Sequence, residues 1–153
     1  MTSNSMTAPS PEEIAAERIE AFCQKYGFQE DNYRLLVCHA AFPLVLTPDL
    51  LYQIWAIFTK KTPWIAVVHI LLSPLCREIG YETYEMELSI RTQLLKELKD
   101  SELQELGQFM LQYITKRLNN SGDQNLKERQ RLTALTYTQP SQAARELAQK
   151  LSD

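Results

Sequence analysis

The chain has 153 residues, of which 44% are apolar and 23% are charged, and its formal net charge is −3. A chain of this length can form one domain with its own core, so it needs no metal or disulfide to fold. Only 4 glycines are present, which argues against a turn-rich all-β fold, and the composition predicts a mainly helical, soluble protein.

The termini and the cysteines set further limits. The longest uncharged runs, 35–48 and 62–76, are shorter than the ~20 apolar residues that cross a bilayer, and both contain proline. The N-terminus lacks the basic and apolar parts of a secretory signal, so we expect a disordered lead-in over residues 1–9 and a cytoplasmic protein. Three widely spaced cysteines favour reduced, buried thiols over a disulfide framework.

Capping signals predict the first helices. Ser10-Pro11-Glu12-Glu13 is a capping box with proline at the first helical position, and it predicts a helix that ends at Gly27. A second helix is expected over 31–41, because Pro43 disfavours helical geometry in the residue before it. Thr47-Pro48-Asp49 then predicts a third helix that runs to about residue 58.

A fourth helix, WIAVVHILL at 64–72, is expected to begin with a threonine cap at Thr62-Pro63 and to end at Ser73-Pro74. It is apolar nearly all round, so we expect it to be the central buried helix. Core packing is also expected for its aromatic residue and for those of the third helix: Tyr52, Trp55, Phe58 and Trp64.

The next segment mixes β-branched and aromatic residues around Gly80, which predicts a hairpin that pairs 76–79 with 81–86. A fifth helix over 88–99 would then complete a winged-helix-like order of helix, hairpin and helix. On this expected helix, one face carries Leu88, Arg91, Leu94, Leu95 and Leu98.

Helical periodicity predicts further helices over 101–118 and 125–136. A last helix after Pro140 has Ala143, Ala144, Leu147 and Leu151 as its expected apolar face. The sequence therefore predicts a mainly α fold, in which a single domain over residues 10–153 contains seven or eight helices and a short hairpin.

Long stretches of the chain, between Glu17 and Leu151, carry a family resemblance. The strings HAAFPLVLTPDLLYQIW, PWIAV, LLSPLCREIGYETYEMELSIRTQLL and TALTYTQPSQAARELA resemble a helical N-terminal module of cyanobacterial multidomain signalling and conflict proteins. In that family the module precedes NACHT- or AAA-type NTPases, WD40 propellers, caspase-like proteases or sulfatase-modifying-type domains.

The resemblance implies a non-enzymatic adaptor with no cofactor, which binds such an effector or sensor in cis or in trans and can self-associate. This chain departs from the family in a shorter segment between Phe58 and Trp64. It also stops at Asp153 with no downstream domain, so we expect either a free-standing adaptor or a fragment of a larger protein.

Catalytic and metal-binding patterns are weak in this sequence. Cys38 and His39 are neighbours on a predicted helix and therefore point about 100° apart, which does not suit a nucleophile and its base. No pair of cysteines or histidines has zinc-finger spacing, and no glycine-rich phosphate loop occurs. Both observations favour a binding protein over an enzyme.

Charge patterning indicates where a partner would bind. Residues 1–115 carry 9 Lys and Arg against 15 Asp and Glu, whereas 116–153 carry 7 against 4. We expect an acidic wing on the hairpin, formed by Glu82, Glu85 and Glu87, and a basic tail that includes Arg129 and Arg131 to steer a protein partner.

The alternative is a winged-helix-like nucleic-acid-binding regulator that uses the basic C-terminal region, which comprises Lys116, Arg117, Lys127, Arg129 and Arg131. It is disfavoured because the WIAVVHILL helix has few groups that contact phosphates or bases and because the acidic wing would repel DNA.

Overall fold

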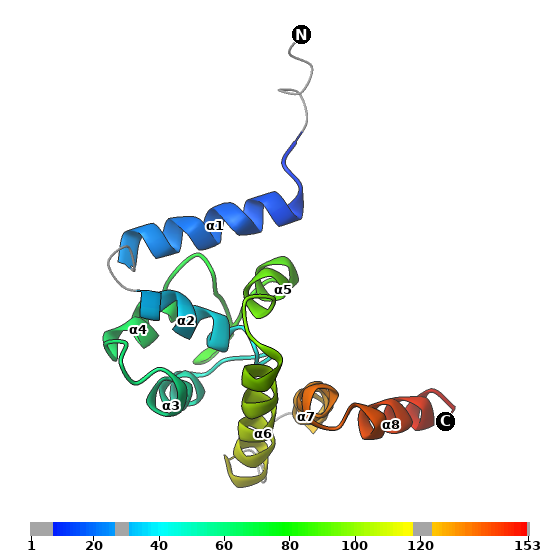
Figure 1. Ribbon diagram of the computed structural model, residues 1–153. Coiled ribbons are helices and arrows are strands. Elements are labelled where there is room, and N and C mark those ends of the chain that lie inside the picture. The colour runs from blue at the N-terminus through cyan, green and yellow to red at the C-terminus, as the bar shows by residue number, and fades with distance from the viewer. Residues whose placement is uncertain (1–7, 27–30, 118–123, 153) are drawn as a thin grey trace. The chain divides into compact units, whose positions relative to one another are not determined.

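The computed structural model describes residues 8–26, 31–117 and 124–152. These residues contain eight helices and one two-stranded antiparallel hairpin, which confirms the predicted mainly helical fold (Figure 1). The chain divides into two compact units, residues 1–97 and 98–153. Residues 1–7 of the predicted lead-in and Gly27 lie outside the described residues, and the prediction of one domain over 10–153 stays a prediction.

The first unit contains five helices and the hairpin. In chain order these are α1 (Pro11–Tyr26), α2 (Asp31–Ala40), α3 (Pro48–Phe58), α4 (Ile65–Leu71), β1 (Arg77–Gly80), β2 (Thr83–Glu85) and α5 (Leu88–Leu95). The capping box forms as predicted, because Glu13 N donates to Ser10 Oγ at 3.1 Å and Ser10 N donates to Glu13 Oε1 at 3.2 Å. Thr47 caps α3 by accepting from Leu50 N at 3.1 Å.

Helix α2 is the central helix of this unit. It packs against α1, α3, α4 and α5, and Figure 1 shows it lying among them. Leu36 and Val37 of α2 are fully buried, as are Ile54 of α3 and Leu94 of α5. The core of the first unit is therefore built around α2.

The prediction that residues 64–72 form the central helix is wrong. Helix α4 spans only seven residues and buries one side, through Ala66, Val67, Ile70 and Leu71. On the opposite side Trp64 is 58% exposed and Leu72 is 74% exposed. Because this helix is apolar on all sides, its sequence does not show which side packs against the core and which side is exposed.

Two related expectations also fail. Thr62 does not cap α4, because its hydroxyl donates to Asn32 O at 3.1 Å and α4 begins without a side-chain cap. Tyr52 is 51% exposed, so Tyr52 and Trp64 are not core residues. Trp55 is half-buried and donates its indole N–H to Thr62 O.

The predicted hairpin forms, but its turn lies at residues 81–82 and Gly80 belongs to β1 instead of the turn. β1 pairs with β2 in the register Arg77 to Glu85, Glu78 to Tyr84 and Gly80 to Thr83. On its other side Tyr84 bridges Leu46, with N–O distances of 2.7 and 2.8 Å. The order α4, hairpin, α5 agrees with the expected helix–hairpin–helix order, whereas the winged-helix likeness itself stays a prediction.

Helix α5 is shorter than predicted, and it buries Ile90 and Leu94, whereas Leu88 is 73% exposed. Arg91 lies beside this buried face because its guanidinium group makes hydrogen bonds to the backbone. Its Nε donates to Ala41 O and its Nη2 donates to Phe42 O, both at 2.9 Å. The guanidinium thereby satisfies two carbonyl groups just beyond the end of α2.

The second unit consists of α6 (Asp100–Arg117), α7 (Gln124–Thr138) and α8 (Pro140–Ser152). Helix α6 packs against α7, and α7 packs against α8. Leu106, Met110 and Ile114 are buried along α6. The expected apolar face of α8 is largely open, because Ala143 is buried but Leu147 and Leu151 are 46% and 88% exposed.

Gly107 marks a close approach of α6 to α7. A Cβ atom there would lie 2.7 Å from Thr138 Cγ2 and 3.0 Å from Ala134 O. We expect Gly107→Ala to lower the free energy of unfolding by about 1–2 kcal/mol, because overpacking outweighs the gain in helix propensity. Thr138→Ser removes the clashing methyl group and should restore part of the loss in a chemical-denaturation series. A Gly107→Ala variant as stable as the wild type would contradict this account.

Candidate functional site

Within residues 8–26, 31–117 and 124–152, no helix is both long enough and apolar enough to span a bilayer. In the same residues, no group of three or more His, Cys, Asp and Glu side chains is arranged to hold a metal ion.

Cys38 and His39 have separate surroundings. Cys38 Sγ lies 3.7 Å from Glu97 Oε1, and burial together with that carboxylate raises the pKa of the thiol to about 12. His39 is buried, its Nδ1 lies 2.8 Å from Leu35 O, and its ring packs against Phe58. The Cys38 thiol is therefore protonated at neutral pH, and the His39 imidazole is buried among its neighbours.

A bidentate ion pair lies between two cysteines of the first unit. Arg34 donates from Nε and Nη2 to the two carboxylate oxygens of Glu97, each at 2.7 Å. Arg34 Nη1 is also 3.5 Å from Cys23 Sγ. Burial raises the pKa of the Cys23 thiol despite the nearby guanidinium. This ion pair joins α2 to Glu97, which lies two residues beyond the end of α5.

The same pair predicts a pH effect. The hydrogen bond from Arg34 lowers the pKa of Glu97 below its ordinary value of 4.5. A lowered pKa contributes stability above the unfolded-state pKa, and the contribution is lost as the pH falls through the folded-state pKa. The stability difference between wild type and Glu97→Gln should therefore be constant from neutral pH down to about pH 5 and shrink below it.

Denaturation curves between neutral and acidic pH test this effect, with Glu17→Gln on the exposed side of α1 as the matched control. A Glu97→Gln difference that grows as the pH falls would contradict the ion-pair account.

The acidic wing is partly neutralised within the molecule. Glu85 pairs with Arg77 across the hairpin, and Glu87 pairs with Arg18 of α1 at 3.4 Å. Glu82 is exposed in the turn, with a positive φ of 51°. Of the three predicted partner-binding carboxylates, only Glu82 has no ionic partner among the described residues.

The basic tail is also partly neutralised. Arg131 pairs with Glu128 and with Glu146 of α8, so it joins α7 to α8. Lys150 adds an ion pair to Glu128 at 3.5 Å. Arg129 is exposed on α7 and has no ionic partner within the described part of the chain. The residues predicted to attract a partner therefore include three whose charge already serves the fold: Glu85, Glu87 and Arg131.

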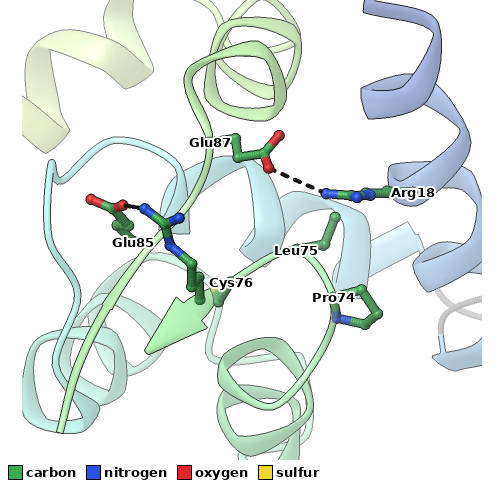
Figure 2. A pocket seen from close by; sticks show the side chains of 7 residues that line it. Arg18, Pro74, Leu75, Cys76, Glu85 and Glu87 are labelled. Atoms are coloured by element: carbon green, nitrogen blue, oxygen red, sulfur yellow. Dashed lines mark hydrogen bonds and ion pairs between the residues drawn. The ribbon is translucent and has the colours of Figure 1, made fainter. Parts of the chain in front are cut away.

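The two ion pairs of the wing line a pocket in the first unit. The pocket has a volume of about 140 Å³ and is lined by Arg18, Pro74, Leu75, Cys76, Arg77, Glu85 and Glu87. Figure 2 shows Arg18 reaching from α1 toward Glu87, with Leu75 and Pro74 beside them. Burial raises the pKa of the Cys76 thiol to about 12, so this part of the wall is uncharged at neutral pH.

The open side of α4 forms an apolar surface that we call the α4 stripe, which consists of Trp64, Ile65, Val68 and Leu72. Their exposed fractions are 58, 36, 37 and 74%. Residues three and four apart lie on the same side of a helix, so these side chains form one continuous row. A continuous exposed apolar row differs from a single exposed side chain such as Leu88, which needs no explanation.

Sequence reasoning missed both surfaces. Arg18 and Glu87 are 69 residues apart, and no local pattern connects them. The α4 stripe was hidden because a helix that is apolar on all sides is normally assigned to the core. The sequence did contain one indication of this exposure. Pro63 and Pro74 limit the helix between them to a short length, and so short a helix contacts few other elements.

Comparison with known proteins gives no further guide, because no protein-family model, curated protein or solved structure matches this chain.

Proposed function

We propose that this chain is a non-enzymatic protein-interaction module, an adaptor of a signalling or defence system that binds a protein effector or sensor in cis or in trans. The α4 stripe carries the proposal. Burial of exposed apolar side chains is the main source of affinity between proteins, and tryptophan is enriched among the residues that dominate binding energy.

The shape of the stripe favours a helical partner. Trp64, Val68 and Leu72 are four residues apart and form one of the ridges by which helices pack into the grooves of other helices. The partner surface is therefore an amphipathic helix with an apolar row about 12 Å long, since eight residues of helix rise by about that distance.

Charge near the stripe specifies the partner further. Lys60 and Lys61 are exposed in the segment that connects α3 to α4. They favour a partner helix that carries acidic residues beside its apolar row, because complementary charges steer association and fix the orientation. Their reversal to glutamate should mainly slow association, whereas the loss of a stripe side chain should mainly speed dissociation.

Two leucines with nearly equal exposure allow a matched test. Leu72 in the stripe is 74% exposed, and Leu88 of α5 outside the stripe is 73% exposed. We expect tagged wild type and Leu88→Ser to capture the same effector or sensor protein from source-cell lysate, and Leu72→Ser to lose it. The captured protein, identified by mass spectrometry and purified, should then bind Leu72→Ser at least about tenfold more weakly than Leu88→Ser.

The proposal fails if Leu72→Ser and Leu88→Ser bind the purified partner equally. It also fails if nuclease treatment of the lysate abolishes capture, since the partner would then be held through nucleic acid.

A further inference from the structure

We propose that the outer edge of β1 binds an extended, basic segment of another protein, which adds to the hairpin as a further antiparallel strand. This inference goes beyond the interaction proposed for the α4 stripe and involves none of its residues.

The backbone of Glu78 points away from the rest of the hairpin. Tyr84 of β2 donates its N–H to Leu46 O at 2.8 Å and accepts from Leu46 N at 2.7 Å. Glu78 is the residue opposite Tyr84 on β1. In an antiparallel ladder, the residue opposite one that bonds outward also directs its N–H and C=O outward. The backbone groups of Glu78 therefore lie on the outer edge of β1.

This edge is open. All four residues of β1 are exposed. In the part of the chain that the structure describes, no backbone hydrogen bond links β1 to any segment other than β2. A strand edge with unpaired donors and acceptors is a template onto which an extended chain can add, with main-chain hydrogen bonds supplying affinity.

Charge at the edge specifies the partner. Glu78 and Glu82 are exposed and, unlike Glu85, form no ion pair with any described residue. Ile79 and Tyr81 lie between them and are 45% and 88% exposed. Opposite charges across neighbouring strands are stabilising, and exposed apolar side chains can cover the aliphatic stems of lysine or arginine. The edge therefore suits a segment that is basic and has apolar residues among its charges.

The same charge disfavours a second copy of this chain. If two copies paired antiparallel through the free backbone groups of Glu78, their two Glu78 carboxylates would lie directly opposite each other, which is destabilising. The irregular register between Glu78 and Gly80 also interrupts the edge, and such bulges are one means by which sheets avoid self-pairing. The occupant is therefore a segment of different sequence.

The ladder geometry sets the pattern of that segment. Only alternate residues of an added strand direct their N–H and C=O to the edge. One of these residues lies directly opposite Glu78 and points to the same face of the sheet, so it should be lysine or arginine. The residues between them point to the other face, where β-branched side chains favour the extended conformation.

The experiment titrates the isotope-labelled full chain with the blocked peptide Thr-Lys-Val-Lys-Val-Lys-Thr and follows its amide signals by NMR. We expect a Kd of about 0.1–1 mM, because the interface is far smaller than the ~1,200 Å² of stable complexes. The largest shifts should occur at residues 77–82. The Glu78 amide, which faces solvent in the free protein, should exchange its hydrogen more slowly when the peptide is bound.

Two backbone-methylated peptides separate strand addition from simple charge attraction. N-methylation of the lysine residues removes the donors that face Glu78, whereas N-methylation of the valine residues alters only the far edge of the peptide, and both peptides keep every charge. The lysine-methylated peptide should bind at least about tenfold more weakly than the valine-methylated one. A peptide with glutamate in place of lysine should bind more weakly still, since it places like charges opposite Glu78.

Variants of the protein make the same separation from the other side. Glu78→Gln keeps the backbone N–H and should weaken binding about two- to fivefold. Glu78→Pro also removes the N–H and should weaken binding at least about fivefold further, and proline is tolerated where an edge N–H faces solvent. Glu17→Gln, on the exposed side of α1, is the control with the same change of charge and should leave Kd unchanged. Melting curves will verify that the variants are folded.

The proposal is overturned if the lysine peptide shifts no signal of residues 77–82 at about 5 mM, a concentration above the expected Kd. It is also overturned if the two methylated peptides bind equally, or if the acidic peptide binds as well as the basic one. Shifts at Glu78 that grow with protein concentration alone would assign the edge to a second copy. The α4 stripe is unchanged in every variant, so failure here leaves the proposed interaction intact, and failure of that interaction leaves this result intact.

Discussion

Replacing Phe42 by alanine is expected to lower the free energy of unfolding by about 3–5 kcal/mol, because a fully buried aromatic side chain leaves a cavity that its neighbours cannot fill. Phe42 is 1% exposed, whereas Trp64 is 58% exposed. Trp64→Ala should therefore cost only about 1 kcal/mol or less, since more than half of its surface is already in water. Urea denaturation of both variants measures the contrast.

This comparison decides which helix is central. Phe42 lies two residues after the end of α2, and Trp64 lies immediately before the start of α4. If Trp64→Ala were as destabilising as Phe42→Ala, the sequence-based placement of residues 64–72 in the middle of the core would be right and the description of the α4 stripe would be wrong.

Replacement of Arg91 by methionine is expected to lower the free energy of unfolding by about 2–4 kcal/mol, which is the second large effect. The change preserves much of the aliphatic packing but removes two charged hydrogen bonds of 2.9 Å to the carbonyl oxygens of Ala41 and Phe42. Both residues are buried, so water cannot easily replace the guanidinium, and buried carbonyl groups without a partner are costly.

Arg77→Met is the matched control, because Arg77 is 73% exposed in its ion pair with Glu85. Exposed pairs contribute about 0–1 kcal/mol, so this variant should unfold close to the wild type. Equal stabilities for Arg91→Met and Arg77→Met would show that the carbonyl contacts of Arg91 contribute nothing measurable.

Local signals predicted the elements well. The capping box at Ser10 and Glu13, the threonine cap at Thr47 and the hairpin between residues 77 and 85 are short-range patterns whose chemistry is complete within a few residues. For that reason the helix count, the order of elements and the start of α3 could be predicted from the sequence.

Burial and pairing were less predictable, because they depend on residues far apart in the chain. The helical period cannot show that α4 packs on one side only, or that Arg91 turns toward the end of α2. The charge pattern likewise predicted an acidic wing and a basic tail, but not that Arg77 and Arg18 would pair with Glu85 and Glu87. Some of the charged residues predicted to bind a partner, such as Glu85, Glu87 and Arg131, form ion pairs within the molecule. The α4 stripe, which was predicted to lie in the core, is exposed.

The proposed interaction can be tested most directly at Trp64 itself. The chain has 2 tryptophans, so 5-fluorotryptophan labelling gives two fluorine NMR signals, and the signal missing from Trp64→Phe identifies Trp64. On titration with the purified partner, our account predicts a shift of the Trp64 signal that saturates with binding, while the signal of half-buried Trp55 changes little. A saturating interaction that leaves the Trp64 signal unmoved would contradict the assignment of the α4 stripe as the binding surface.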